Sequence, residues 1–495
     1  MDIIKIILNN CSQFSSKPVL FDDLQYNYKL LGDNSRKLAG ALQRMGVQPG
    51  DRIAVQLPKC VEFIYLFLAG LQIGSIMVPL NNTYTLDEIK YFLSDSGCKL
   101  FVCDQEMKNI FSHISVSSST LDHCLSLSEL SALCSGEDNC CDSEHHAEDP
   151  CLIIYTSGTT GKSKGAVLTR NNLLSNYLSL KEAWQYHPDD ILLHCLPLFH
   201  VHGLLVAFLG AAATGMGMVI RTKFDAEDVL RCINTYHCTI FMGVPTMYQR
   251  LLQVAHRSQF RTSSIRLWIS GSAPLTASTF IEFTKAFDST ILERYGMSET
   301  GMNISNPLWG ERKPGSIGLP LPGIAVRIVD DQSLDVSHGS VGQLLIKGAN
   351  VFQGYWRQPE KTAESFVDGW FKTGDLGYQD EAGYFYLVSR AKDLIISGGL
   401  NVYPKEVEDT IEQLDTIAEA AVIGIPDQDL GEQVVAVVVP RNNKTLTSAS
   451  VISYCRNKLA PYKCPKQVHI VSELPKNTMG KIMKNQLRES YRMPT

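Results

Sequence analysis

The sequence predicts an α/β protein with a large N-terminal domain of parallel-rich layered sheets, a small β-rich subdomain and an α+β C-terminal domain. Strand-like and helix-like segments alternate between residues 51 and 103, which favours a parallel sheet covered on both faces. From Gly315 the chain changes to short β runs between Gly and Pro turns, which indicates a small antiparallel or barrel-like unit. Beyond residue 393, helix and strand patterns mix over a length typical of one domain.

Each element is placed by the spacing of its apolar residues. Over 26–47, Leu31, Leu38 and Leu42 recur at helical spacing, and Gly46 stands where a helix would end. We expect the next elements to be a strand at 51–57, a buried helix at 60–73, a strand at 76–79, a helix at 87–96 and a strand at 100–103. Further strands are expected at 151–155, 191–195, 239–243, 267–269 and 291–294, with a helix at 170–186. The β-rich unit should use 325–329, 341–346 and 385–388, and the last domain a helix from Pro404, strands at 420–425, 434–439 and 467–471, and a helix at 447–459.

Length and composition limit the function classes. At 495 residues the chain exceeds what one core usually supports, so we expect domains at 1–389 and 394–495, joined by a charged link at 390–393. The net charge of −6 offers no basic excess for a nucleic-acid partner. Fourteen cysteines without paired spacing are typical of reduced thiols. The first ten residues favour an amphipathic helix over a signal peptide, and Leu204–Ile220 favours a buried helix and strand over a membrane span. We therefore expect a cytoplasmic protein, monomeric or homodimeric, with no transmembrane segment.

A polar loop follows the apolar strand at 151–155. Between Thr156 and Gly165 it combines glycines, hydroxyl groups and lysines, which together supply backbone N–H groups, further donors and positive charge to an anion. This composition is typical of polyphosphate binding, with a flexible surface loop as the alternative. The loop is not a Walker A loop, because Gly158 and Gly161 are too close together.

Three successive strands end in small, polar or aromatic residues. These tips are Val244–Arg250, Ser270–Pro274 and Tyr295–Thr300. In a doubly wound sheet ligands bind at the carboxyl ends of the strands, so we expect the three tips to line one cleft. An adenine could stack on Tyr295, and Glu299 offers a hard oxygen ligand to the Mg²⁺ of a nucleotide triphosphate.

Other polar residues are less specific by themselves. His200 and His202 supply at most two metal ligands, so a positioning or lining role is favoured. Asp375 follows what the sequence predicts to be a tight turn, and it suits either a ribose diol or a plain turn aspartate. Lys481 beside Gly480 could be an ordinary surface lysine.

Taken in order along nearly the whole chain, these segments resemble the AMP-forming acyl-CoA synthetases of the adenylate-forming superfamily. The motifs that carry the resemblance are Tyr155–Gly165, Tyr295–Thr300, Lys372–Asp375, Arg390 with Asn401–Glu408, and Gly480–Lys481. The resemblance implies two steps: a carboxylic acid attacks the α-phosphate of Mg·ATP to give an acyl-adenylate, and coenzyme A then takes the acyl group and releases AMP. It also implies that the C-terminal domain swings about Lys392 between the steps.

The resemblance assigns roles to individual residues. The β- and γ-phosphates would be held by Thr156, Ser157, Gly158, Thr159, Thr160, Gly161 and Lys164. Gly271, Ser272, Ala273, Pro274 and Tyr295 would hold adenine, and Asp375 and Arg390 the ribose, with Gly296, Met297 and Ser298 as further cofactor-binding residues. Lys481, His200 and Glu299 would be catalytic, Glu299 would also bind Mg²⁺, and Gly398 and Gly399 would help to admit coenzyme A.

Within the superfamily the chain is most similar to malonyl-CoA synthetases. The shared segments are Phe199–Leu204, Val244–Thr246 with Arg250, Ser270–Pro274 and Ser298–Met302. The resemblance implies that Arg250 and Ser272 bind the distal carboxylate of a dicarboxylic acid, with His202 also at the substrate. Arg–carboxylate pairing is bidentate and directional, which agrees with that role. Alternatively, Arg250 points to solvent.

Other functions stay open at this point. The acid could be a medium- or long-chain fatty acid, the acceptor could be a carrier-protein thiol, or the chain could bind nucleotide without catalysis. Three residues depart from the usual pattern of the superfamily: Ser163 stands where Pro is common, Ser298 where Thr is usual and Ser389 where Gly is the norm. The last departure bears on the hinge and not on the chemistry.

Overall fold

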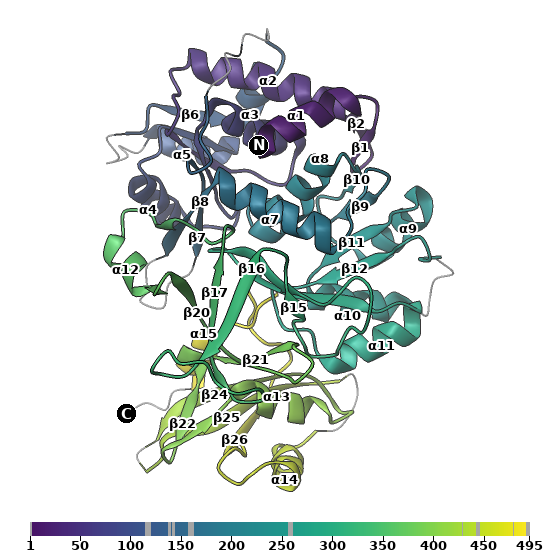
Figure 1. The fold of residues 1–495 in the computed structure, drawn as a ribbon, viewed down its shortest axis with the longest axis vertical. Helices are drawn as coiled ribbons and strands as arrows, with labels where there is room; N and C mark the ends of the chain where they lie inside the picture. Colours follow the sequence, from purple (N-terminus) through teal and green to yellow (C-terminus); the bar gives the residue numbers. More distant parts are fainter. Residues whose placement is uncertain are drawn as a thin grey trace.

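The computed structural model describes residues 2–113, 120–136, 140, 144–156, 163–255, 261–427, 429–441, 446–478 and 480–491. Two large sheets form the upper part of the molecule in Figure 1, and a smaller α+β unit lies at the opposite end. The mixed α/β architecture with a separate C-terminal α+β unit confirms the fold class that the sequence predicts.

The first large sheet carries the strand tips that the sequence singles out. In the described chain its order is β15 (Leu319–Pro320), β14 (Gly301–Ser305), β13 (Ile291–Met297), β12 (Leu267–Ser270), β11 (Ile240–Gly243), β9 (Ile191–His194), β10 (Gly217–Ile220), β1 (Pro18–Phe21) and β2 (Leu24–Asn27). The strands from β1 to β13 along this order pair in parallel. Helices α9 (Ala226–Tyr236), α10 (Pro245–Ala255) and α11 (Ala277–Phe287) cover one face with an aromatic-rich core.

The second large sheet holds the polar loop. Its order in the described chain is β18 (Gly354–Tyr355), β8 (Lys164–Thr169), β7 (Pro150–Thr156), β4 (Ile76–Pro79), β3 (Arg52–Gln56), β5 (Leu100–Cys103) and β6 (His123–Ser126). Its helices are α2 (Tyr28–Arg44), α3 (Val61–Ile73), α4 (Leu86–Ser96), α5 (Gln105–His113) and α6 (Leu127–Leu133).

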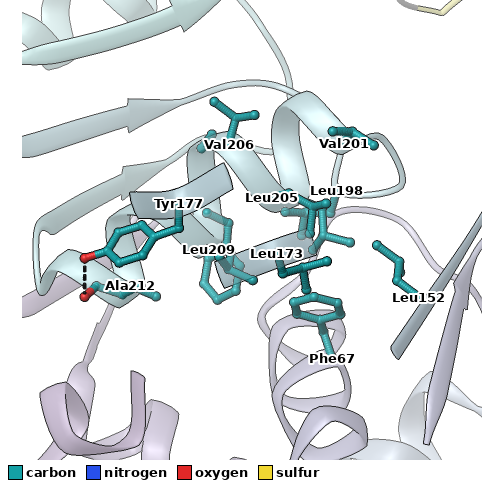
Figure 2. Packing of buried hydrophobic residues seen from close by; sticks show 14 of the residues in the cluster. Phe67, Leu152, Leu173, Tyr177, Leu198, Val201, Leu205, Val206, Leu209 and Ala212 are labelled. Carbon is teal, nitrogen blue, oxygen red and sulfur yellow. Dashed lines mark hydrogen bonds between the residues drawn. The ribbon is translucent and has the colours of Figure 1, made fainter. Parts of the chain in front are cut away.

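One continuous core joins the two large sheets. Phe67 of α3 lies there with Tyr177 of α7 (Arg170–Ala183) and with Leu205 and Leu209 of a π-helix, η1 (His202–Leu209), as Figure 2 shows. Helices α1 (Ile3–Gln13) and α8 (Gly210–Thr214) complete this layer. Burial of each side chain of this size contributes about 1.5–3 kcal/mol to the stability of the fold. The core therefore holds in place the π-helix, which begins at His202.

The remaining strands form two smaller sheets. The β-rich unit consists of β16 (Ile324–Val329), β17 (Gly342–Gly348), β20 (Trp370–Gln379), β19 (Phe366–Val367) and β21 (Phe385–Arg390), with α12 (Pro359–Glu364) beside it. The C-terminal sheet consists of β23 (Leu400–Val402), β22 (Ile395–Ser397), β25 (Gly431–Pro440), β24 (Ile417–Asp427) and β26 (Gln467–Ile470), with helices α13 (Pro404–Glu412), α14 (Ser448–Lys458) and α15 (Lys484–Tyr491). Between them, Ala391–Asp393 forms the short 3-10 turn η2.

Two local expectations are wrong. The polar loop does not lead directly into a helix: β8 follows it and pairs antiparallel with β7, so the loop closes a hairpin. Asp375 does not follow a tight turn but lies inside the long strand β20, at a bulge where Gly374 has φ +72°. The residue pattern alone does not distinguish a hairpin from a loop that leads into a helix, or a bulge from a tight turn, because the composition of the segment is the same in each case. No helix in the described part of the chain is both long and apolar enough to cross a membrane.

Candidate active site

The three predicted strand tips lie at one edge of the first sheet. Gly243 of β11 is level with Ser270 of β12, and Ser270 is level with Glu293 of β13. Because these strands are parallel, their carboxyl ends place the starts of the three following segments side by side.

The residues expected at the ribose form a connected group. The Tyr295 hydroxyl donates to Asp375 Oδ2 at 2.6 Å, and Arg390 Nε lies 3.0 Å from Asp375 Oδ1. The bulge holds the carboxylate in place, because the Asp375 amide donates to Thr373 Oγ1 at 3.0 Å. Asp375 raises the pKa of Arg390, which stays charged. Each carboxylate oxygen keeps a second lone pair, so the group can still accept hydroxyl donors.

Glu299 comes four residues after Tyr295 in the sequence. It is buried in the turn between β13 and β14, and burial raises the pKa of its carboxyl. The Tyr355 hydroxyl donates to Glu299 Oε1 at 3.1 Å, and the ammonium of Lys164 lies 4.9 Å from the centre of the Tyr355 ring. Sequence reasoning missed Tyr355, whose only signal is an aromatic in a Gly-Tyr-Trp run. Gly296, Met297 and Ser298 form the half-buried connection from Tyr295 to Glu299.

The donor set suits Mg²⁺. One hard carboxylate, with the remaining ligands from phosphate and water, is the usual arrangement for this ion beside a nucleotide. No group of three or more His, Cys, Asp or Glu able to hold a metal by protein ligands alone occurs in the described residues.

Most of the expected phosphate loop lies outside the described residues. This applies to Ser157, Gly158, Thr159, Thr160 and Gly161. Thr156 and Lys164, at the two ends of the loop, are paired across the mouth of the hairpin.

Lys481 comes to the Asp375–Arg390 group from the segment between β26 and α15. A Cβ built on Gly480 would lie 3.1 Å from Oγ1 of Thr246, at the start of α10. Asn81 Nδ2 donates to Thr478 Oγ1 at 3.4 Å. Burial, and then the charge of Arg390, lower the pKa of Lys481 to about 8. The structure therefore brings Lys481 beside Asp375 and Arg390, which are far away in the sequence.

A second polar group lies around His202. Its Nδ1 is 3.2 Å from Ser272 Oγ, and Ser272 adopts φ +72°, a strained conformation for a residue other than glycine. Burial lowers the pKa of His200 to about 4 and holds the pKa of His202 well below its usual value, so both rings are neutral at pH 7. Nε2 of each ring is buried and has no hydrogen-bond partner among the described residues.

Other expected residues do not join these groups. Arg250 is exposed on α10 and makes no hydrogen bond or ion pair with another described residue. Gly398 and Gly399 are exposed in the β22–β23 turn, where the Gly398 amide donates to Leu430 O within the C-terminal unit. Lys392 is exposed in η2, Ala273 is half-buried and Pro274 is exposed.

Comparisons with known proteins cover both parts of the chain. A family model described as AMP-binding enzyme matches residues 8–356, and one described as AMP-binding enzyme C-terminal domain matches residues 406–481. A long-chain-fatty-acid–CoA ligase of Bacillus subtilis is 33% identical over 98% of this chain and 93% of its own length. A malonate–CoA ligase of Arabidopsis thaliana is 34% identical over 93% of this chain and 80% of its own length.

Solved structures agree with the sequence relatives. ATP-bound MatB from Rhodopseudomonas palustris is 40% identical, with a TM-score of 0.94 over 100% of this chain and 99% of that chain. The TM-score against the apo form of the same protein is 0.84 at the same identity and coverage. The arrangement of the chain is thus more similar to the ATP-bound form.

Proposed function

The chain belongs to the AMP-binding enzyme family and is an AMP-forming CoA ligase, and from this premise we propose that its acid substrate is malonate or a similarly short dicarboxylate. The observation that carries the proposal is the hydrogen-bonded pair of His202 and Ser272. A pocket for an alkyl chain would place apolar side chains there, because buried polar groups bind an apolar ligand poorly.

A small cavity lies between α7 and the π-helix η1. A cavity lined by Tyr177, Tyr186, Leu205 and Leu209 has a volume of about 10 Å³, which is room for one water molecule. As it stands, this cavity takes no alkyl chain.

We propose that the nucleotide-side residues act as the resemblance implies. Asp375 and Arg390 hold the ribose, and the hairpin loop with Lys164 holds the terminal phosphates. Glu299, oriented by Tyr355, is the residue that would hold Mg²⁺, which when bound supplies charge neutralisation to the phosphates. Lys481 neutralises the charge that develops between the carboxylate and the α-phosphate. We propose the neutral His200 as a further catalytic residue beside the reacting carboxylate.

We propose that the second step uses another face of the C-terminal domain. Residues 1–389 and 394–495 would move relative to each other about Lys392 in the link 390–393. Gly398 and Gly399 would then turn to the cleft and help to admit coenzyme A. The free thiols of the described cysteines are consistent with a cytoplasmic location, which we also propose.

Arg250 is proposed to lie at the entrance for the acid. It is one helical turn beyond Thr246, which contacts Gly480, so the two residues share a face of α10. Because Arg250 is exposed, it is better suited to attract an anion from solvent than to hold one in a buried pocket.

The experiment is the release of pyrophosphate and AMP with Mg·ATP and coenzyme A over malonate, methylmalonate, succinate, acetate, octanoate and palmitate. We expect malonate to lead, and Arg250→Ala to lower malonate turnover more than acetate turnover. If the enzyme turns over octanoate or palmitate fastest, and Arg250→Ala leaves that rate unchanged, the substrate is a fatty acid. The similarity to a long-chain-fatty-acid–CoA ligase makes this the competing function.

A further inference from the structure

Lys59 links the two large sheets near the candidate active site. It stands between β3 and α3 of the second sheet, and its amino group contacts residues at the carboxyl ends of β9 and β10 in the first. Lys59 Nζ donates to His194 O at 2.8 Å and to Arg221 O at 2.9 Å, and it lies 3.0 Å from His194 Nδ1. An ammonium group has three N–H donors, so these three acceptors satisfy it completely.

His194 connects Lys59 to the start of the π-helix η1. Its ring is fully buried, and Nε2 lies 2.9 Å from Gly203 O. Because a carbonyl oxygen only accepts, Nε2 carries the ring proton and Nδ1 is an acceptor, which receives both Lys59 and the Leu196 amide at 3.2 Å. Burial, and then the charge of Lys59, hold the pKa of His194 well below its usual value, so the ring is neutral at pH 7 and keeps this one tautomer.

The segment that the His194 ring closes carries both histidines of the candidate site. We call residues 195–203 the histidine loop; it leaves β9 directly after His194 and returns to the His194 ring at Gly203. A Cβ on Gly203 would lie 2.0 Å from Pro197 O, so the loop folds back tightly against its own end. His200 and His202 stand on this loop, and a change at His194 therefore reaches both of them.

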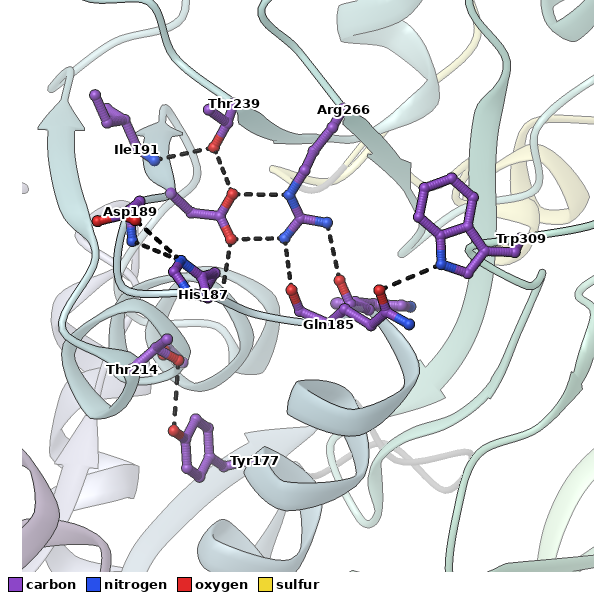
Figure 3. A network of polar contacts seen from close by, with 12 residues as sticks. Tyr177, Gln185, His187, Asp189, Ile191, Thr214, Thr239, Arg266 and Trp309 are labelled. Atoms are coloured by element: carbon purple, nitrogen blue, oxygen red, sulfur yellow. Dashed lines mark hydrogen bonds and ion pairs between the residues drawn. The ribbon is translucent and has the colours of Figure 1, made fainter.

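The other end of β9 is held by contacts that do not touch the histidine loop. Asp190, directly before β9, receives two hydrogen bonds from Arg266, from Nε at 2.8 Å and from Nη2 at 2.6 Å (Figure 3). The Ile191 amide donates to Thr239 Oγ1 at 3.0 Å in the same network. Arg266 and Lys59 thus both hold β9, but only Lys59 does so at the end that leads into the site.

We propose that Lys59 is a positioning residue for activation of the acid: acting through His194, it holds the histidine loop so that His200 and His202 meet the acid in one fixed geometry. This inference rests on the proposed function, which places these two histidines at the acid. Asp375 and Arg390, proposed to hold the ribose, come from β20 and β21. Lys59 should therefore affect the use of the acid and leave the binding of ATP unchanged.

The contact between Lys59 and His194 does not depend on the charge of Lys59. Burial lowers the pKa of Lys59 to about 7. The amine that remains above this pH keeps two N–H donors, one for His194 Nδ1 and one for Arg221 O, while His194 O still accepts from the Arg221 amide at 3.0 Å. The expected effect of Lys59 is therefore on the KM for the acid and not on the pH profile.

The test is a double-mutant cycle measured by pyrophosphate release with malonate. Lys59→Met should lower kcat/KM for malonate about tenfold, mainly through the KM for malonate, with the KM for ATP unchanged. His194→Phe keeps a ring but removes both nitrogens, and it should lower kcat/KM further because the contact with Gly203 is lost as well. The double variant should be no worse than His194→Phe, since without these nitrogens Lys59 no longer reaches the loop. Losses that multiply in the double variant would overturn the inference.

Two further variants separate positioning from support of the fold. Arg266→Met leaves Asp190 buried without its partner, so it should lower Tm and leave the KM for malonate unchanged. Lys59→Gln keeps two N–H donors on a side chain of nearly the same length; it should lose less than Lys59→Met, and it replaces Lys59→Met in the cycle if that variant does not fold. Equal rises in the KM for malonate and for ATP, together with a lower Tm, would make Lys59 a structural residue.

The outcomes also separate the inference from the proposed function. If the wild type turns over malonate and Lys59→Met does so with the same KM, the inference is wrong and the proposed function stands. A wild type that activates only octanoate or palmitate would refute the proposed substrate. The same cycle, run with that acid, would then still decide whether Lys59 acts through His194.

Discussion

Lys481 shows how the surroundings of one residue set the pH range of a reaction. Burial and the charge of Arg390 lower its pKa to about 8, so its ammonium is present below pH 8 and is lost as the pH rises through that value. We propose that the first step needs this charge. We therefore expect kcat/KM for adenylation to stay constant up to about pH 8 and then to fall tenfold per pH unit. The measurement is pyrophosphate release at substrate concentrations well below KM.

Two variants test this assignment. Lys481→Ala should lower adenylation about 10²- to 10³-fold while ATP binding persists. Lys481→Arg keeps a positive charge throughout the range, so its lower rate should show no decline above pH 8. The same decline in Lys481→Arg would mean that another group titrates.

At the residue scale, the sequence identifies functional residues that stand in a recognisable local motif. Tyr295, Asp375 and Arg390 were expected in one nucleotide site, and the structure brings them together. Tyr355 was missed, because what distinguishes it is packing: its hydroxyl is aimed at Glu299. Burial and pairing depend on the tertiary structure, which a single sequence does not display.

At the element scale, strands and helices with strong apolar spacing were predicted well, and the details that set side-chain direction were not. The helix expected at 60–73 is α3 (Val61–Ile73), and the strand expected at 76–79 is β4. The β7–β8 hairpin and the bulge in β20 escaped prediction. Both depend on which strand pairs with which, and apolar spacing does not encode register in polar, glycine-containing segments.

The bulge in β20 leads to a prediction about ATP. Gly374 has φ +72°, and a Cβ there would meet nothing within 4 Å, so Gly374→Ala costs only the left-handed backbone, about 1–2 kcal/mol. Relief of that strain would flatten the bulge and move Asp375 away from Tyr295. We expect a lower Tm and about a tenfold higher KM for ATP, measured by pyrophosphate release, since one charged contact is worth about 1.4 kcal/mol or more.

A second glycine provides the control for this prediction. Gly323, in the exposed turn before β16, has φ +77° and the same open space for a Cβ. Gly323→Ala should lower Tm by a similar amount and leave the KM for ATP unchanged. An equal rise in the KM for ATP in both variants would mean that the position of Asp375 does not determine ATP binding.

At the scale of the whole molecule, we propose that the active site is complete only while the C-terminal unit is docked. Lys481 contributes to the cleft through contacts that span the chain, such as Gly480 against Thr246 and Thr478 against Asn81. Exposed ion pairs between the units, such as Arg441 with Glu282, add little because solvent screens them. Weak polar contacts of this kind suit the domain movement that we propose.

Locking that interface tests the proposed two-step cycle. The side chains of Asn81 and Thr478 meet at 3.4 Å, so Asn81→Cys with Thr478→Cys should form a disulfide under mild oxidation that holds Lys481 in the cleft. We expect the oxidised enzyme to release pyrophosphate in a single turnover at nearly the unlocked rate. Thioester formation should fall roughly 100-fold, because coenzyme A would meet the wrong face of the C-terminal domain, and dithiothreitol should restore it.

The single variants and the oxidised wild type control for the native thiols, of which Cys60, Cys124 and Cys140 are only half-buried. Loss of both steps on oxidation would mean that the disulfide distorts the cleft, and a longer bismaleimide bridge between the same two cysteines would then replace it. Unimpaired thioester formation in the fully cross-linked enzyme would contradict the swing about Lys392. In that case coenzyme A would have to reach the acyl-adenylate with Lys481 still in place, and one arrangement of the domains would serve both steps.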